Sequence, residues 1–379
     1  MATILAGFFC MIVGFNSYPL IETNGGKAFG AGEDRAEANS PEKTKASEKT
    51  EEGLQNQTVI ITPEGSGYNS WPFIRTLRNR LVCVYSRGVV HSVDERVRGT
   101  FARVSEDGGK TWLPETTVIN TPNSGETSEG SGLDAKGNML LFVRIASPKL
   151  KHDLYRSEDG VHFIKIASLD LNPAPMQVMD IVQLRNGDLM TFWFAGSYRN
   201  TQNGAWGTLI SRDNGLSWQQ QTIESGLSKE NWPTEHSAIV HPDGRILVVA
   251  RAESSGGEIA QFQIESEDNG TTWKKYRTNI TNIRESTPAL LYDRENGLIS
   301  NYYYQRGEGI LWRRVAAFDD IWHNAQKWPD SELVIKASAN GCHAGNVKGT
   351  LFGNKHALAL YSGNETQTAI VTLVVSSPK

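Results

Sequence analysis

The chain has 379 residues, 39% of them hydrophobic, and a formal net charge of −4. This length allows two or three domains as a prior, although all-β folds often exceed two hundred residues as a single domain. The charge gives no general basic field, which argues against nucleic acid as a partner, and three cysteines are too few for a disulfide scaffold.

The first 56 residues divide into an apolar and a polar segment. Residues 3–15 form an apolar run that is too short to span a bilayer and long enough for the core of a signal peptide. Residues 1–21 are therefore predicted to be a signal peptide, the alternative being a short apolar segment of another kind. Residues 22–56 have almost no large apolar side chains, which predicts a disordered polar linker. We expect a secreted or periplasmic protein with no membrane insertion.

Four copies of a short motif, the Asp box, follow in the remaining chain. Their aspartates are spaced 52, 54 and 55 residues apart, and the copies begin at Ser105, Ser157, Ser211 and Ser266. The serine and aspartate side chains of such a motif bond backbone amides across a tight turn, and its glycine takes a positive φ. The closing Trp or Phe packs back onto the neighbouring strands. Each box is therefore predicted to be the tip of a β-hairpin.

A second periodic signal, a turn followed by an apolar run, lies midway between the boxes. Its six copies are at 78–82, 136–140, 186–190, 243–247, 296–299 and 353–358. Turn residues before an apolar run favour a hairpin, so each unit has two hairpins, or four strands. Six such units at a period near fifty predict that residues 57–379 form an all-β, six-bladed β-propeller of four-stranded antiparallel blades. The segments 58–62 and 368–375 are expected to share one blade.

An arginine follows the apolar second strand in four of the units. These residues are Arg87, Arg144, Arg251 and Arg306. Equivalent positions in different blades face the same side of the ring, and several desolvated guanidinium groups repel one another unless an anion lies between them. A carboxylate or sulfate would bind them through paired hydrogen bonds. The alternative is that each arginine pairs with an acid of a neighbouring blade.

Asp boxes in a six-bladed propeller, with an inward Glu and Arg, resemble the sialidase (neuraminidase) superfamily. The best local match is residues 231–251, which are similar to the stretch that carries the family's catalytic Glu, here Glu235, and an arginine of its carboxylate-binding triad, here Arg251. Arg306 lies in a segment that resembles the one with the last triad arginine. Asp94, eleven residues before Ser105, falls where the family has its acid/base Asp.

Two positions depart from the family pattern. Ser70 stands where the family has its first triad arginine, and Arg75 is offset from that place by five residues. The stretch that should carry the nucleophilic tyrosine, residues 341–347, contains His343 and no tyrosine. The resemblance therefore implies a divergent member that has only part of the catalytic set.

The resemblance implies an exo-acting glycoside hydrolase for an acidic sugar such as a sialoside. Hydrolysis commonly needs a proton donor and a second carboxyl group, for which Asp94 and Glu235 are the candidates. Arg87, Arg251 and Arg306 would then hold the carboxylate of the substrate, which is an acidic glycan or glycoconjugate.

Three histidines lie close to these positions and open a second reading. His343 is a catalytic candidate, while His91 and His236 are candidates for substrate binding, although a lone histidine is more often structural. If His343 and His91 converge with a tyrosine such as Tyr85, proton abstraction beside a uronate carboxylate becomes feasible, which would make the protein a polysaccharide lyase. A third reading is a non-catalytic carbohydrate-binding propeller.

The remaining expectations concern cofactors, assembly and cysteines. The histidines show no metal-ligand spacing, so we expect neither metal nor cofactor, and we expect a monomer. Cys83 and Cys342 fall in neighbouring units of the ring, where a bridge is one alternative and two buried free thiols are the favoured one.

Overall fold

The computed structural model describes residues 57–379 apart from 199, 254–258 and 284. The predicted signal peptide (1–21) and linker (22–56) lie outside the described residues. By their internal contacts, the described residues belong to one compact unit. No helix among the described residues is both long and apolar enough to cross a membrane.

The fold is all-β, and four of its sheets have four antiparallel strands each, which follow one another along the chain. The first has β6 (Glu126–Leu133), β7 (Met139–Ile145), β8 (Lys151–Ser157) and β9 (Ile164–Leu169). The second has β10 (Gln177–Gln183), β11 (Leu189–Ser197), β12 (Asn200–Ser211) and β13 (Gln219–Leu227). The third has β14 (Pro233–Val240), β15 (Ile246–Ala252), β16 (Phe262–Ser266) and β17 (Lys274–Arg277). The fourth has β18 (Ala289–Asp293), β19 (Leu298–Gln305), β20 (Ile310–Ala317) and β21 (Glu332–Lys336).

The fifth sheet has eight strands and joins the two ends of the described chain. One half has β2 (Tyr68–Leu77), β3 (Arg80–Gly88), β4 (Gly99–Ser105) and β5 (Thr116–Ile119). The other half has β22 (Ala344–Phe352), β23 (Lys355–Gly363), β24 (Thr368–Ser376) and β1 (Thr58–Ile60). Both halves are antiparallel, and a single parallel pairing of Tyr68 with Thr368 connects them. β1 pairs with β24, so the two terminal segments meet in one sheet as expected.

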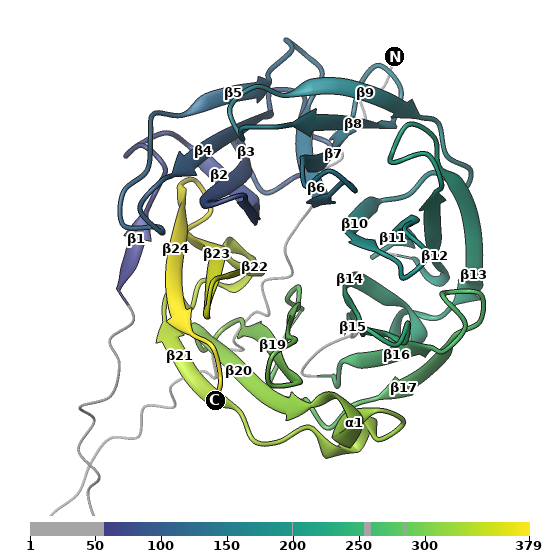
Figure 1. The fold of residues 1–379 in the computed structure, drawn as a ribbon. Helices are drawn as coiled ribbons and strands as arrows, with labels where there is room; N and C mark the ends of the chain where they lie inside the picture. The colour runs from purple at the N-terminus through teal and green to yellow at the C-terminus, as the bar shows by residue number, and fades with distance from the viewer. Residues whose placement is uncertain (1–56, 199, 254–258, 284) are drawn as a thin grey trace, which may run out of the picture. The chain divides into compact units, whose positions relative to one another are not determined.

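The sheets are arranged around a common centre, with β2, β6, β10, β14, β18 and β22 as the inner strands (Figure 1). Short helical turns lie between strands, and they are η1 (Lys229–Asn231), α1 (Phe318–Ile321), η2 (Ala325–Lys327) and η3 (Gly341–His343). The core lies between neighbouring sheets. For example, Leu140 and Phe142 of β7 pack with Trp193 of β11 and Leu209 of β12.

Both kinds of predicted turn are present where the sequence places them. In the first Asp box, the Ser105 hydroxyl donates to Asp107 (2.9 Å) and accepts from the Gly109 amide (2.8 Å), while the Thr111 amide donates to Asp107 (2.9 Å). The other three boxes repeat this pattern between the third and fourth strands of their sheets. The second signal joins the first two strands of each unit, and the boxes join the third and fourth strands of the four units that carry one. In the last unit the outermost pair, β24 with β1, is formed by the two terminal segments and not by a hairpin.

A buried ion cluster ties three inner strands together across the centre. Asp180 of β10 contacts Arg75 of β2 and lies 3.1 Å from the Lys348 ammonium of β22. Arg75 also donates to two backbone carbonyls, those of Ser131 (2.8 Å) and Gly349 (3.1 Å). Burial opposes ionisation of Asp180, but Arg75 and Lys348 outweigh it and hold the pKa of that carboxyl below its usual range. Arg75 is thus occupied by this cluster.

The two cysteines of the described chain differ from each other. Cys83 is a buried free thiol in β3, as favoured, so it forms no bridge with Cys342. The prediction that Cys342 is also a buried free thiol is wrong. That residue lies half-buried in the η3 turn instead of in a buried strand.

Candidate active site

Irregularities in the inner strands aim side chains at the centre. The pairing of five inner strands with their neighbours shifts register, including β2 between Ser70 and Phe73 and β14 between Thr234 and Ser237. Such bulges redirect side chains and are frequent near active sites. Three non-glycine residues at these bulges have positive φ, namely Trp71 (49°), Glu235 (47°) and Asn346 (50°). This strained conformation clusters at functional sites.

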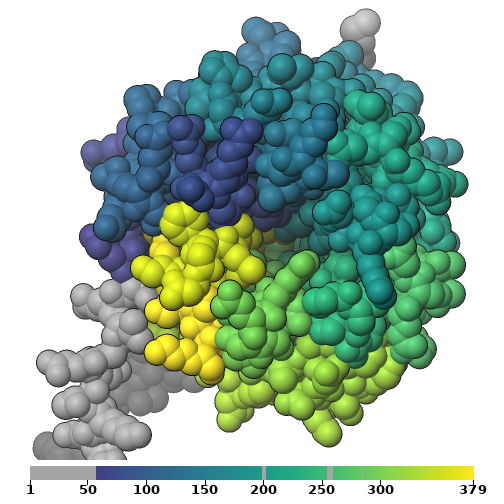
Figure 2. Space-filling view, viewed as in Figure 1, coloured from purple at the N-terminus to yellow at the C-terminus, as the bar shows by residue number. Residues whose placement is uncertain are grey.

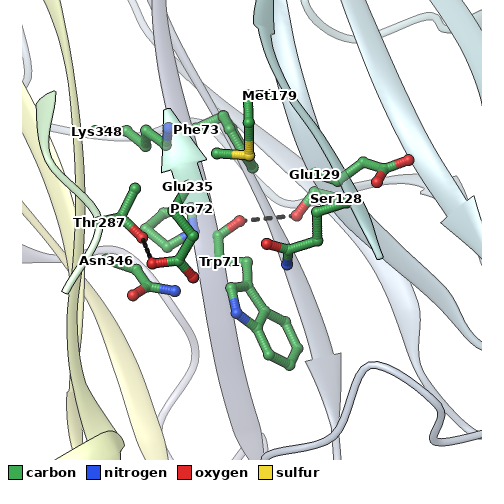
Figure 3. A pocket seen from close by; sticks show the side chains of 11 residues that line it. Trp71, Pro72, Phe73, Ser128, Glu129, Met179, Glu235, Thr287, Asn346 and Lys348 are labelled. Atoms are coloured by element: carbon green, nitrogen blue, oxygen red, sulfur yellow. Dashed lines mark hydrogen bonds between the residues drawn. The ribbon is translucent and has the colours of Figure 1, made fainter. Parts of the chain in front are cut away.

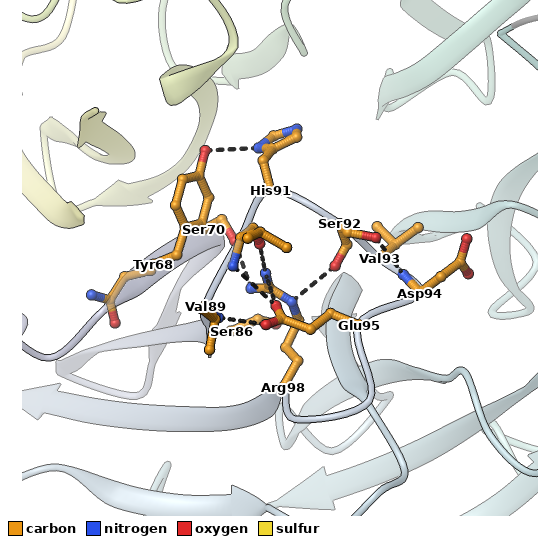
Figure 4. Close-up of polar contacts among 12 residues, drawn as sticks. Tyr68, Ser70, Ser86, Val89, His91, Ser92, Val93, Asp94, Glu95 and Arg98 are labelled. Carbon is orange, nitrogen blue, oxygen red and sulfur yellow. Dashed lines mark hydrogen bonds and ion pairs between the residues drawn. The ribbon is translucent and has the colours of Figure 1, made fainter. Parts of the chain in front are cut away.

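A tyrosine and two histidines meet where the two halves of the eight-stranded sheet join. Tyr68, the first residue of β2, has its hydroxyl 2.8 Å from Nδ1 of His91 and 3.0 Å from Nδ1 of His343. His91 belongs to the loop between β3 and β4, and His343 ends η3 just before β22. Figure 4 shows His91 pointing from its loop towards Tyr68. The hydroxyl of Tyr68 therefore bridges two imidazoles that are 252 positions apart in the chain.

The electrostatics of this cluster keep all three groups neutral. Burial, together with Arg306 and Arg98, holds the pKa of His91 well below its usual value. Burial also lowers the pKa of His343, against a smaller opposing effect of Glu365. The Tyr68 hydroxyl is fully buried, and this burial raises its pKa far above the usual value. Two uncharged imidazoles and an intact hydroxyl are the forms expected near neutral pH.

Arg306 lies beside this cluster and has no acidic partner among the described residues. Its guanidinium donates to Asn346 Oδ1 (3.0 Å), to the Tyr361 hydroxyl (3.1 Å) and to the carbonyls of Ala344 (2.9 Å) and Glu285 (2.5 Å). The side chain is 8% exposed. A buried guanidinium held only by neutral acceptors favours an anionic ligand.

Arg251, in contrast, is neutralised by two carboxylates. Its guanidinium lies 3.0 Å from Glu235 and 2.8 Å from Glu253, and all three side chains are buried. Thr287 donates a further hydrogen bond to Glu235 (2.8 Å). Burial raises the pKa of Glu253, whereas Arg251 and Arg306 outweigh burial at Glu235 and lower its pKa. Glu235 is thus an ionised acceptor and a poor proton donor.

The loop that carries His91 is fastened by a buried arginine. Arg98 is fully buried and forms an ion pair with Glu95 (2.9 Å). It donates to the carbonyls of Val90 and Ser92 in the same loop, and to the Ser70 hydroxyl of β2 at 3.0 Å. Its guanidinium also lies over the Trp71 ring, 4.7 Å from the ring centre. Arg98 thus fills the space beside Ser70, the residue that replaces the first triad arginine of the resembled family (Figure 4).

A small pocket lies at the centre of the inner strands beside Glu235, and neither Tyr68, His91, His343 nor Arg306 lines it. It is lined by Trp71, Glu129, Glu235, Thr287, Asn346 and Lys348, among others (Figure 3). The space-filling view shows that the surface is hollowed at the centre of the face drawn in Figure 2. Among the residues described, no group of three or more His, Cys, Asp or Glu is placed to hold a metal ion.

Three of the predicted site residues come together, and two others are adjacent. His91, His343 and Arg306 share the Tyr68 and Tyr361 neighbourhood, since the Tyr361 ring lies 6.1 Å from His91 and 6.4 Å from Tyr68. Glu235 and Arg251 stand next to this group, and their charges act on Tyr361.

The other predicted residues are placed elsewhere. Arg87 is bound to Glu115 (2.9 Å) and Asn69 (2.9 Å) within the first half of the eight-stranded sheet, so the expectation that it binds substrate is not supported by its position. Asp94 is 49% exposed and pairs with Arg144 at 2.7 Å, as the alternative for these arginines foresaw.

The placement of His236 contradicts its prediction as a binding residue. It is fully buried between Phe192 and Trp206, and neither ring nitrogen has a hydrogen-bond partner. Successive residues of a strand point to opposite sides, so the bulge that aims Glu235 at the centre sends His236 into the core. Burial lowers its pKa to about 3.

The sequence reasoning missed Tyr68, Tyr361 and Arg98. Tyr85, named as the tyrosine for the histidines, bonds Glu115 instead. A signal for Tyr361 was available, because it stands at the end of its apolar run, as Arg251 does in its own unit. Both pair with an inner strand just before the bulge. Nothing in the local sequence marks Tyr68.

Comparisons with known proteins agree with this architecture. The sequence model of one family, the BNR repeat-like domain, matches residues 131–322, just over half of the chain. The chain therefore belongs to the BNR repeat-like domain family. No curated protein matches the sequence.

Solved structures show the same fold at low identity. A protein of unknown function from Dyadobacter fermentans superposes with a TM-score of 0.69 at 15% identity, covering 85% of this chain and 98% of the other. The Hadza microbial sialidase Hz136 superposes with a TM-score of 0.61 at 15% identity, covering 82% of this chain and 66% of the sialidase. The NanB sialidase from Streptococcus pneumoniae superposes with a TM-score of 0.66 at 11% identity, covering 85% of this chain and 70% of the sialidase. The chain thus shares the sialidase-like propeller fold and spans about two thirds of the length of these two sialidases.

Proposed function

We propose that this chain is an enzyme that cleaves an acidic glycan at the centre of the propeller, and that the reaction is β-elimination of a uronate. The observation that carries the proposal is the bridge from Tyr68 to His91 and His343, formed beside Arg306. In this proposal each half of the eight-stranded sheet is one blade, so that the propeller has six blades. It also keeps the expectation of a secreted, monomeric protein.

Elimination from a uronate has three requirements, and each has a candidate here. The charge that develops on the substrate carboxylate must be stabilised, and Arg306 offers a cation without an acidic partner among the described residues. A neutral base must remove the proton at C5, and a donor must protonate the leaving oxygen at C4. The two neutral histidines fit both roles, because their lowered pKa values leave them uncharged.

Sialidase-like hydrolysis is the second candidate, and the shared fold favours it. In that reaction Glu235 would activate a nucleophile, for which Tyr361 is the candidate. The Tyr361 hydroxyl accepts a hydrogen bond from Arg306, and burial, together with the charge of Glu235, raises its pKa. Against it, the Tyr361 hydroxyl donates to the Cys342 carbonyl (2.6 Å), and Glu235 is occupied by Arg251 and Thr287. The geometry therefore supports elimination better than hydrolysis.

Purified protein should be assayed on sialosides and on uronate polymers. Elimination creates a C4=C5 double bond that absorbs in the ultraviolet, whereas hydrolysis gives a saturated product. Glu235→Gln should retain elimination, and under the hydrolase alternative it should abolish turnover. Binding without any product would leave a carbohydrate-binding propeller and would overturn the proposal.

Substitution of Arg306 tests the anion site. A hydrogen bond to a charged group contributes about 1.5–3 kcal/mol, so Arg306→Met should raise KM by about 10- to 100-fold. Arg245→Met is the matched control, because Arg245 is saturated by Asp243 (2.7 Å) and Asp319 (2.8 Å) and lies over Phe318. An unchanged KM in Arg306→Met would remove this residue from substrate binding.

A further inference from the structure

The bridging hydroxyl of Tyr68 constrains where the protons of the two histidines lie. A phenol has one proton, so the hydroxyl can donate to only one of two acceptors. It lies within hydrogen-bond distance of Nδ1 on both His91 and His343, at 2.8 and 3.0 Å. When it donates to one Nδ1, the other imidazole must carry its proton on Nδ1 and donate to the phenol oxygen.

This constraint gives the two neutral histidines opposite tautomers. The histidine that accepts from Tyr68 carries its own proton on Nε2, and the histidine that donates to Tyr68 has a bare Nε2. One Nε2 is then a proton donor and the other a base. Neither ring has its Nε2 tied by a strong hydrogen bond, since the contact of His343 is a long one to Cys342 Sγ (3.8 Å) and His91 Nε2 contacts no described partner.

We propose that His91 and His343 act as a complementary acid and base, coupled through Tyr68, and that they select uronates whose C5 hydrogen and C4 oxygen lie on the same face of the sugar ring. This inference rests on the proposed function. Both imidazoles are held by one hydroxyl with ring centres 6.3 Å apart, so they approach a bound sugar from one side. D-Glucuronate and D-mannuronate have the required configuration, whereas D-galacturonate, L-guluronate and L-iduronate have the two groups on opposite faces.

The step balances without a further reactant. The bare Nε2 takes the C5 proton, the C5–H electron pair forms the C4=C5 bond, and the C4–O bond breaks with its electrons on oxygen. The other Nε2–H protonates that oxygen. In the same event, the Nδ1 proton of the base moves to Tyr68 and the phenol proton moves to Nδ1 of the acid. All three side chains end neutral, with the two tautomers exchanged.

The substrate arm of the test uses the unaltered protein and two matched pairs of polymers. Polymannuronate and polyguluronate differ in configuration at C5, and polyglucuronate and polygalacturonate differ at C4. We expect an ultraviolet-absorbing product from polymannuronate or polyglucuronate and none from the other two. A product from polyguluronate or polygalacturonate would overturn the same-face inference while leaving elimination intact. No such product from any of the four would overturn the proposed elimination itself.

The residue arm tests the coupling through Tyr68. General acid–base catalysis contributes about 10²- to 10⁴-fold, so Tyr68→Phe should lower kcat at least about 100-fold with little change in KM. Tyr302→Phe is the matched control, since Tyr302 is a fully buried tyrosine bonded to Nδ1 of His356 at 2.8 Å, outside the site. It should leave kcat unchanged. If Tyr68→Phe has the same kcat as the unaltered protein and the same unfolding midpoint, the coupling of the two histidines through Tyr68 is refuted.

Discussion

Removal of the Asp180 carboxylate should destabilise the fold strongly. The side chain is 12% exposed, and it contacts Arg75 and the 3%-exposed Lys348 from two other inner strands. Asp180→Ala leaves these two cations buried without an acid between them. Because breaking a buried pair by removing one partner costs about 3–5 kcal/mol, we expect a loss of that size in the free energy of unfolding.

Urea unfolding followed by tryptophan fluorescence measures this loss. The matched control is Asp170→Ala, whose partner Lys149 is 72% exposed, and such surface pairs contribute about 0–1 kcal/mol. The pKa of Asp180 is lowered in the folded state, so its contribution is present above the unfolded pKa of about 4 and is lost as the pH falls through the folded pKa. The free energies of unfolding of the unaltered protein and of Asp180→Ala should therefore become equal in strong acid. A loss below about 1 kcal/mol at neutral pH, equal to that of the control, would refute this account of the cluster.

Three further predictions concern other parts of the fold. His236 has its pKa lowered to about 3, so the unfolded chain binds its proton first as the pH falls from about 6.5 to 3. Stability should drop in that window by up to about 1.4 kcal/mol per pH unit, and His236→Phe should remove this component of pH-dependent unfolding. Ser211→Ala deprives the Gly215 amide of its acceptor (2.8 Å) and should cost about 1–3 kcal/mol in urea unfolding, with no loss contradicting the role of the box serine. Arg98→Lys cannot reproduce the guanidinium hydrogen bonds that hold the His91 loop, so kcat should fall by a larger factor than KM changes. Kinetics identical to those of the unaltered protein would exclude a positioning role for Arg98.

The local structure of this protein was readable from its residues because the signals are short-range. Each Asp box closes its own turn through bonds within five residues, as Ser105, Asp107 and Thr111 show. Repetition of that unit predicted four-stranded antiparallel sheets, and the structure has them. Glu235 and Arg251 could likewise be paired in advance, since they lie on adjacent strands of one hairpin.

The candidate site was only partly predictable because its contacts join distant parts of the chain. His91 and His343 were named with a tyrosine such as Tyr85, but the tyrosine between them is Tyr68, which no local pattern marks. His236 was named beside its neighbour Glu235, although alternation along a strand already places the two side chains on opposite sides, and it lies in the core without a hydrogen-bond partner.

The sequence by itself determined the repeating hairpins, because hydrogen bonds within a turn and alternation along a strand depend on neighbouring residues. Only the tertiary structure decided which side chains meet at the centre. The pairing of Tyr68 with Thr368 brings β2 against the last strands of the chain, so Tyr68 reaches a histidine 275 residues away. Contacts of that separation depend on how the sheets close around the centre, and no local pattern in the sequence encodes them.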